Sequence, residues 1–133
     1  MAATVLALPP AWAEYDSMTR VARAAGDDLG AGEGRHLRIS GLGFVPTLGA
    51  SPAVAWQARR QGWQPHYLTP WPFPEDADHL WAGTGPEDAD TIYLTDSAEA
   101  ELAKNVPATA RVVAVLRMTH REGDIGVYRD PGS

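Results

Sequence analysis

The sequence contains no cysteine, and Lys104 is its only lysine. The missing thiols exclude disulfide bonds, thiolate catalysis and cysteine metal sites, and 133 residues are enough to bury a core without them. No Lys or Arg occurs between Gln61 and Ala103, whereas nine Asp or Glu residues do, and the net charge of the chain is −6. Nucleic-acid binding requires a basic surface, so we do not expect it.

Long hydrophobic runs are missing as well, and no stretch has enough apolar residues to span a bilayer. The N-terminal residues are apolar, but they lack a basic start and are interrupted by Pro9 and Pro10, which makes them a poor signal peptide. We expect residues 1–133 to form one domain, with residues 1–11 flexible or the remnant of a membrane-proximal segment.

Hydrophobic periodicity predicts two long helices. Apolar positions recur at helical spacing from Trp12 to Leu29, and the second helix is expected from Ser51, acting as its N-cap, to Gln61. A shorter helix is expected at residues 96–106, with Asp96 as its cap. Alternating or continuous apolar residues predict strands at residues 36–44, 63–68, 90–95, 111–116 and 125–129.

The order of these elements predicts an α/β fold. We expect a small, Rossmann-like three-layer sandwich with a mostly parallel sheet of four or five strands. Pro65 favours an edge position for its strand, while the continuous apolar run from Arg111 to Leu116 is typical of a strand buried on both faces. The turn at Glu122–Asp124 predicts that the C-terminal strand is antiparallel to its predecessor, as in a hairpin.

The first candidate ligand site is the loop of residues 41–52. Gly41, Gly43 and Ser51 follow a strand and precede a helix, where backbone N–H groups of an open α/β sheet bind anionic ligands. The spacing is not that of a dinucleotide-binding or phosphate-binding motif, however, because Pro46 occupies the place of a third glycine. The simpler interpretation is that these glycines serve turn geometry and close packing.

The second candidate is a cluster of aromatic residues next to the acidic stretch. Aromatic rings beside carboxylates are a common way to hold sugars, because the ring faces stack and the carboxylates accept hydroxyl hydrogen bonds. The same rings could instead pack the loop onto its own domain. The residues concerned are Trp63, Tyr67, Trp71 and Trp81.

The third candidate is a metal site formed by nitrogen and oxygen ligands in a short span. His66, Asp76, Asp78 and His79 could together hold a divalent cation, and no other cofactor is expected. This run is rich in proline and lies in a predicted loop, which is a poor scaffold for a metal. A solvated acidic loop is therefore the simpler interpretation.

Most of the chain resembles the soluble extracytoplasmic C-terminal domain of bacterial membrane-embedded glycosyltransferases of the GT-C class, the group that includes protein mannosyltransferase relatives. The segments that carry the resemblance are Tyr15–Leu29, Leu37–Gly43, Ser51–Trp56, Arg59–Trp63, Asp90–Leu94, Val112–Leu116 and Val127–Arg129. The catalytic carboxylates of that family lie between transmembrane helices. The resemblance therefore implies no catalytic residue in this chain.

The resemblance implies a non-catalytic domain that assists the binding of an acceptor or of a lipid-linked sugar donor. Its partners would be the membrane portion of a parent protein, or a carbohydrate or lipid-linked sugar. It would be extracytoplasmic and associated with the membrane through the parent chain. Two alternatives stay open, and in both the chain would be cytoplasmic. One is a free-standing α/β domain that binds a small phosphorylated or sugar ligand at residues 41–52. The other is a metal-dependent enzyme that uses residues 66–79.

Overall fold

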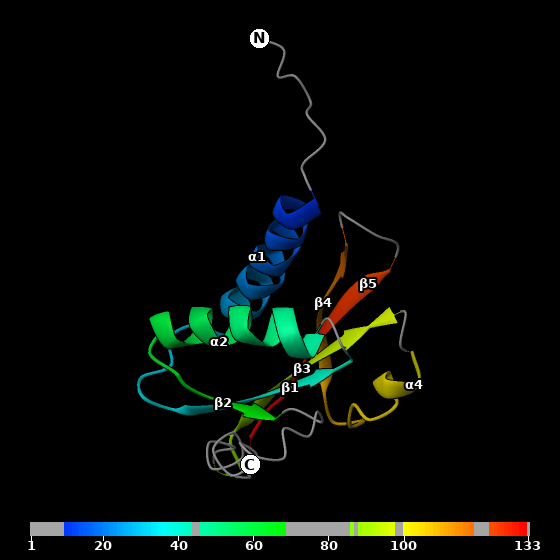
Figure 1. The fold of residues 1–133 in the computed structure, drawn as a ribbon. Helices are drawn as coiled ribbons and strands as arrows, with labels where there is room; N and C mark the ends of the chain where they lie inside the picture. Colours follow the sequence, from blue (N-terminus) through cyan, green and yellow to red (C-terminus); the bar gives the residue numbers. More distant parts are fainter. Residues whose placement is uncertain are drawn as a thin grey trace, which may run out of the picture.

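The structure is a computed structural model that describes residues 10–43, 46–68, 86, 88–97, 100–118 and 123–132. Figure 1 shows a twisted sheet with two longer helices, α1 and α2, packed beside each other. In chain order the elements are α1 (Pro10–Leu29), β1 (His36–Leu42), η1 (a π-helix, Pro46–Ala50), α2 (Ser51–Arg60), β2 (Gln64–Leu68), β3 (Asp90–Asp96), α4 (Ala100–Ala103), β4 (Arg111–Arg117) and β5 (Asp124–Asp130).

The sheet is mixed, with the strand order β2-β1-β3-β5-β4. Strand β1 pairs in parallel with β2 and β3, whereas β5 is antiparallel to both of its neighbours, β3 and β4. The fold is α/β, but the expectation of a mostly parallel sheet is wrong. The reason is that β5 inserts between β3 and β4 instead of adding to the outside of the sheet, so that half of the pairings become antiparallel.

The core lies between one face of the sheet and the two long helices. Each of the three inner strands contributes two fully buried residues to this face, namely Leu37 and Ile39, Ile92 and Leu94, and Ile125 and Val127. Val21 and Ala25 of α1 and Val54 and Ala58 of α2 cover them. Burying a side chain such as Leu or Ile stabilises the fold by about 1.5–3 kcal/mol. Because both helices cover the same face, they make one helical layer, and the described residues do not form the predicted three-layer arrangement.

Strand β4 lies at an edge of the sheet and not inside it. The side chains of Val112 and Val115 are each 58% exposed, so the prediction of a strand buried on both faces is wrong. A continuous apolar run cannot by itself distinguish a central strand from an edge strand. The edge position predicted from Pro65 is confirmed, since β2 is the opposite edge of the sheet.

The predicted start of the second helix is wrong. Helical structure begins at Pro46 with η1, so Ser51 lies inside a continuous helical segment and makes no side-chain cap. Its hydroxyl donates instead to the Pro46 carbonyl at 2.8 Å. Asp96, the other predicted cap, is the last residue of β3 and is only 2% exposed, and α4 begins at Ala100. Residues 98 and 99 between them lie outside the described residues, so the cap at Asp96 stays a prediction.

Candidate functional site

A groove of about 780 Å³ lies between α1 and α2, and we call it the α1/α2 groove. It lies on the helical layer, on the side away from the sheet core. Its lining residues are Met18, Thr19, Ala22 and Arg23 of α1, Gly49 of η1, and Pro52, Ala53, Trp56, Gln57 and Arg60 of α2. They recur at intervals of three or four residues, so each helix presents a single stripe of side chains to the groove.

The floor of the groove is apolar and its rim is cationic. Met18 and Ala22 are buried at the floor, and the Trp56 side chain stands at the rim with 61% of its surface exposed. The Arg60 guanidinium lies 4.5 Å from the centroid of the Trp56 ring, a cation–π contact. Arg23 and Arg60 are exposed, and no Asp or Glu occurs among the described residues that line the groove.

The groove owes its shape to a close contact at one end of the two helices. Gly26 of α1 has no side chain, and a Cβ there would lie 2.4 Å from Gln61 Oε1 and 2.7 Å from Gln57 Cγ. The Gln61 amide donates to the carbonyls of Gly26 and Gly30, both at 2.8 Å. This contact joins α2 to the C-terminal part of α1. The helices are thereby held rigidly at one end, and the apolar floor lies beyond it, towards Met18.

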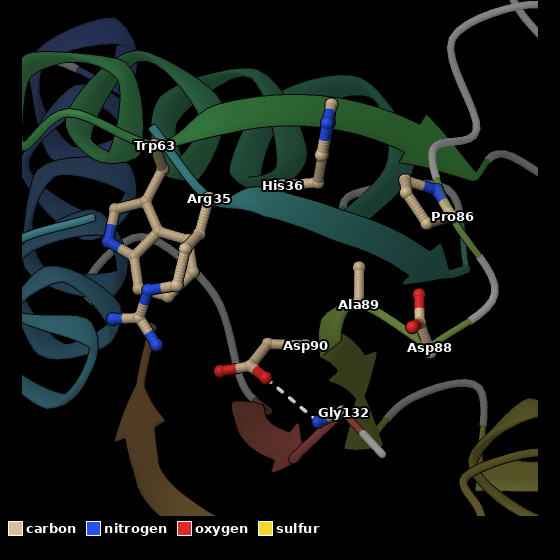
Figure 2. Close-up of a pocket in the computed structure, with 8 residues that line it drawn as sticks. All are labelled: Arg35, His36, Trp63, Pro86, Asp88, Ala89, Asp90 and Gly132. Atoms are coloured by element: carbon tan, nitrogen blue, oxygen red, sulfur yellow. Dashed lines mark hydrogen bonds between the residues drawn. The ribbon is translucent and has the colours of Figure 1, made fainter. Parts of the chain in front are cut away.

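A smaller, polar pocket of about 420 Å³ lies where β1 and β3 begin, beside the residues that follow β5 (Figure 2). Its lining residues are Arg35, His36, Trp63, Pro86, Asp88, Ala89, Asp90 and Gly132. Figure 2 shows the Arg35 guanidinium beside the Trp63 indole, and its carbon lies 4.4 Å from the ring centroid. Trp63 is only 3% exposed, and its Nε1 donates to the Gly30 carbonyl. The indole is therefore a wall of the pocket and offers no open face for a sugar.

One wall of this pocket belongs to a chain of ion pairs. Arg129 of β5 bonds both Asp90 and Asp28, and Asp28 also pairs with Arg111 at 2.8 Å. Burial alone would raise the pKa of Asp90, but hydrogen bonds from Arg129 and the Gly132 N–H outweigh it and hold the pKa below its ordinary range. The pKa of Asp28 is lowered in the same way, against burial, by Arg111 and Arg129. These groups hold the strands and α1 together and are already neutralised, so they have little charge left for a ligand.

In the loop of residues 41–52, which was predicted to bind a ligand, the glycines and the Ser51 hydroxyl have structural roles. Gly43 has φ +122°, a conformation that L side chains rarely adopt, which explains the glycine. Gly41 lies within β1, paired with Leu94, and Ser51 is 3% exposed with its hydroxyl on Pro46. Gly43 and Ser51 therefore serve local backbone geometry, and Gly41 belongs to the sheet. Ligand binding there stays a prediction.

Trp63 is the only one of the four predicted aromatic ligand residues whose side chain is among the described parts of the structure. Tyr67 lies in β2, where the backbone alone is described, and Trp71 and Trp81 lie outside the described residues. The predicted metal ligands Asp76, Asp78 and His79 also lie outside them. His66 meets another histidine instead, since its Nε2 is 2.7 Å from His36 Nδ1.

In the part of the chain that the structure describes, no three His, Cys, Asp or Glu side chains gather where they could hold a metal ion. No described helix is both long and apolar enough to cross a membrane, in agreement with the prediction from the sequence.

The α1/α2 groove was not predicted from the sequence, although a signal was present. Trp56 and Arg60 are four residues apart on a helix whose inner face consists of Val54, Ala55 and Ala58. A tryptophan outside the apolar face of a short helix, followed by an arginine one turn later, indicates a candidate binding surface.

Comparison with known proteins gives no further information on the site, since no family model, curated protein or solved structure matches this chain.

Proposed function

We propose that this chain is a non-catalytic accessory domain of a membrane-embedded glycosyltransferase-like protein, and that its α1/α2 groove assists the binding of a lipid-linked sugar donor. The observation that carries the proposal is the combination of an apolar floor with a rim of arginines in an otherwise acidic chain. Such a groove suits an anionic amphiphile. A lipid chain that ends in phosphate is a ligand of this kind.

Each part of that ligand has a complementary part in the groove. The hydrocarbon would lie on Met18, Ala22 and Ala53, where each buried methylene contributes about 0.8 kcal/mol. The phosphate would lie between Arg23 and Arg60, because guanidinium groups match phosphate oxygens in geometry and are weakly hydrated. The Trp56 ring would cover the junction of the two, as indoles do where apolar and aqueous regions meet.

The position of the groove along α1 agrees with a donor held in a bilayer. If α1 leaves the membrane at its N-terminal end, as the resemblance implies, Met18 lies eight and Arg23 thirteen residues beyond Pro10. Thirteen helical residues span about 20 Å, so the phosphate would stand about that far from the membrane surface, with the first lipid carbons beside Met18. The phosphate group and the first carbons of the lipid could therefore enter the groove while the rest stays in the bilayer.

A binding experiment with dodecyl phosphate tests the proposal on the isolated chain. Isothermal titration below the critical micelle concentration should give saturable binding, whereas neutral dodecyl maltoside should bind much more weakly. Arg23→Gln and Arg60→Gln should each weaken dodecyl phosphate binding by about fivefold, the effect of one exposed charge pair of about 1 kcal/mol. The matched control is Arg59→Gln, which removes an exposed arginine from the same helix but not from the groove.

The proposal is refuted if dodecyl phosphate and dodecyl maltoside bind alike, or if the Arg59 variant loses as much affinity as the Arg60 variant. The accessory role has a separate test in the parent enzyme. Deleting residues 12–129 there should reduce transfer from the lipid-linked donor. Unchanged transfer and unchanged acceptor choice would show that this domain does not have the role.

A further inference from the structure

The outer edge of β4 is an exposed surface that takes no part in the proposed lipid binding. It ends the sheet, and its side chains Val112 and Val115 are two of the three large hydrophobic residues that are exposed in the described part of the chain. An edge strand presents unpaired backbone N–H and C=O groups that can pair with another strand. Exposed valines beside such an edge add an apolar contact to that pairing.

The arrangement of side chains along β4 is symmetric about its centre. The ladder with β5 shifts between Val112 and Ala114, which is a β-bulge, and both Val113 and Ala114 pack against the core. The two bulge residues together occupy one position of the ladder. Val112 and Val115 therefore stand one position to either side of the bulge, and they face the same way, since they are opposite Tyr128 and Gly126 of β5.

We propose that a second copy of this chain pairs with this edge, with β4 antiparallel to its counterpart and the two-fold axis at the bulge. In this register Val112 lies opposite the partner's Val115, and Val115 lies opposite the partner's Val112. Directly opposed β-branched residues on one face are among the favourable cross-strand pairs. A one-residue slip would put valine opposite a residue that faces the core, so the register is specified by the side chains themselves.

The charges on the strand are compatible with this pairing. Arg117 lies opposite the partner's Ala110, and Arg111 lies opposite the partner's Leu116, so no arginine faces another arginine directly. The charge of Arg111 is also neutralised within its own chain by Asp28. Each copy carries a net charge of −6, which opposes association at long range. The dimer should therefore strengthen when salt screens this repulsion.

The size of the contact predicts a reversible dimer. One strand pair and four valines bury less surface than the roughly 1,200 Å² or more of most stable interfaces. Two five-stranded sheets would join into one, which removes this edge from both copies.

Sedimentation equilibrium over a range of protein concentrations tests the pairing. The unmodified chain should show a monomer–dimer equilibrium that shifts towards dimer with added salt. Val112→Lys and Val115→Lys should each raise the dissociation constant at least tenfold. The matched control is Trp56→Lys, which changes the third exposed large hydrophobic residue and should leave the dimer intact.

A cross-linking experiment tests the register of the two strands. It also tests the pairing itself if a lysine variant fails to fold. Because the chain has no cysteine, single Val112→Cys and Val115→Cys variants can be mixed under oxidising conditions. The mixture should give a disulfide-linked heterodimer, while each variant alone should give little. A monomer at every concentration overturns the proposal, as does equal cross-linking of each variant with itself. Neither result bears on lipid binding in the groove.

Discussion

The Arg129 guanidinium joins two carboxylates that are almost closed off from water. It bonds Asp90 and Asp28, and the exposed fractions of the three side chains are 15%, 17% and 19% respectively. Arg129→Met preserves much of the side-chain length but removes the charge. Asp90 would then retain the Gly132 N–H, and Asp28 would retain Arg111.

We expect this substitution to lower the free energy of unfolding by about 2–3 kcal/mol. Breaking a fully buried ion pair costs about 3–5 kcal/mol, because a charge is left without compensation. Here the residual exposure and the surviving partners relieve part of that cost. For a domain of 133 residues the loss corresponds to a Tm lower by about 10 °C.

The pH dependence gives a sharper test. Burial alone would raise the pKa of Asp90, but hydrogen bonds from Arg129 and Gly132 hold it below 3.8 in the folded state. Such a carboxyl stabilises the fold above pH 3.8, and that contribution is lost as the pH falls through the lower folded pKa. In Arg129→Met only the Gly132 N–H and the charge of Arg35 still oppose the effect of burial, so the pKa of Asp90 should rise towards its ordinary value. Ionised Asp90 then contributes less stability, and the variant should lose less stability than the unmodified chain as the pH falls through the acid range.

Urea unfolding followed by tryptophan fluorescence, repeated over a range of pH, measures both the loss of unfolding free energy and its pH dependence. The control is Lys104→Met, which breaks a pair whose side chains are 72% and 87% exposed and should cost less than about 0.5 kcal/mol. A loss below about 1 kcal/mol in Arg129→Met would show that the chain of ion pairs contributes little. A pH profile parallel to that of the unmodified chain would show that Asp90 does not depend on Arg129.

Two further predictions concern the same end of the sheet. Gly32→Ala should lower the free energy of unfolding by about 2–3 kcal/mol, because the new Cβ would lie 2.5 Å from the Trp63 backbone nitrogen. Gly30→Ala, with φ +66° but nothing within 4 Å, should cost only about 1 kcal/mol, and equal losses in urea unfolding would contradict the steric argument. The pKa of Tyr93 is raised above 10.0 by burial and by Asp130, against a smaller opposite effect of Arg38. Asp130→Asn should therefore lower the pKa of Tyr93 in a carbon-13 NMR titration without returning it to 10.0, and an unchanged midpoint would exclude the contribution of Asp130.

Sequence reasoning located most elements because their signals are local. The stripe from Met18 to Leu29 and the alternation at Leu37 and Ile39 depend on neighbours within a few residues, and the structure has a helix and a strand there. Pro65 indicated the edge strand β2 for an equally local reason, the missing N–H.

What the sequence could not provide was pairing over long distances. The residues around Ile125 and Val127 do not indicate which strands will pair with β5. In the structure β5 lies between β3 and β4 and is antiparallel to both, which makes the sheet mixed. The α1/α2 groove has the same origin, because Ala22 reads as a core position until the angle between the two helices is known. The start of the second helix was missed because η1 runs directly into α2 at Ser51, which no capping rule anticipates.

The insertion of β5 also has a consequence for how the chain is made. Strand β5 is synthesised after every other described strand, yet it occupies the position between β3 and β4. On the ribosome, β1, β2 and β3 can pair as they emerge, but one edge of β3 stays open until residue 130 has left the exit tunnel. A nascent chain that ends before β5 should accordingly be protease-sensitive throughout β4 and prone to strand exchange. Full protection should appear only when the last strand closes the gap.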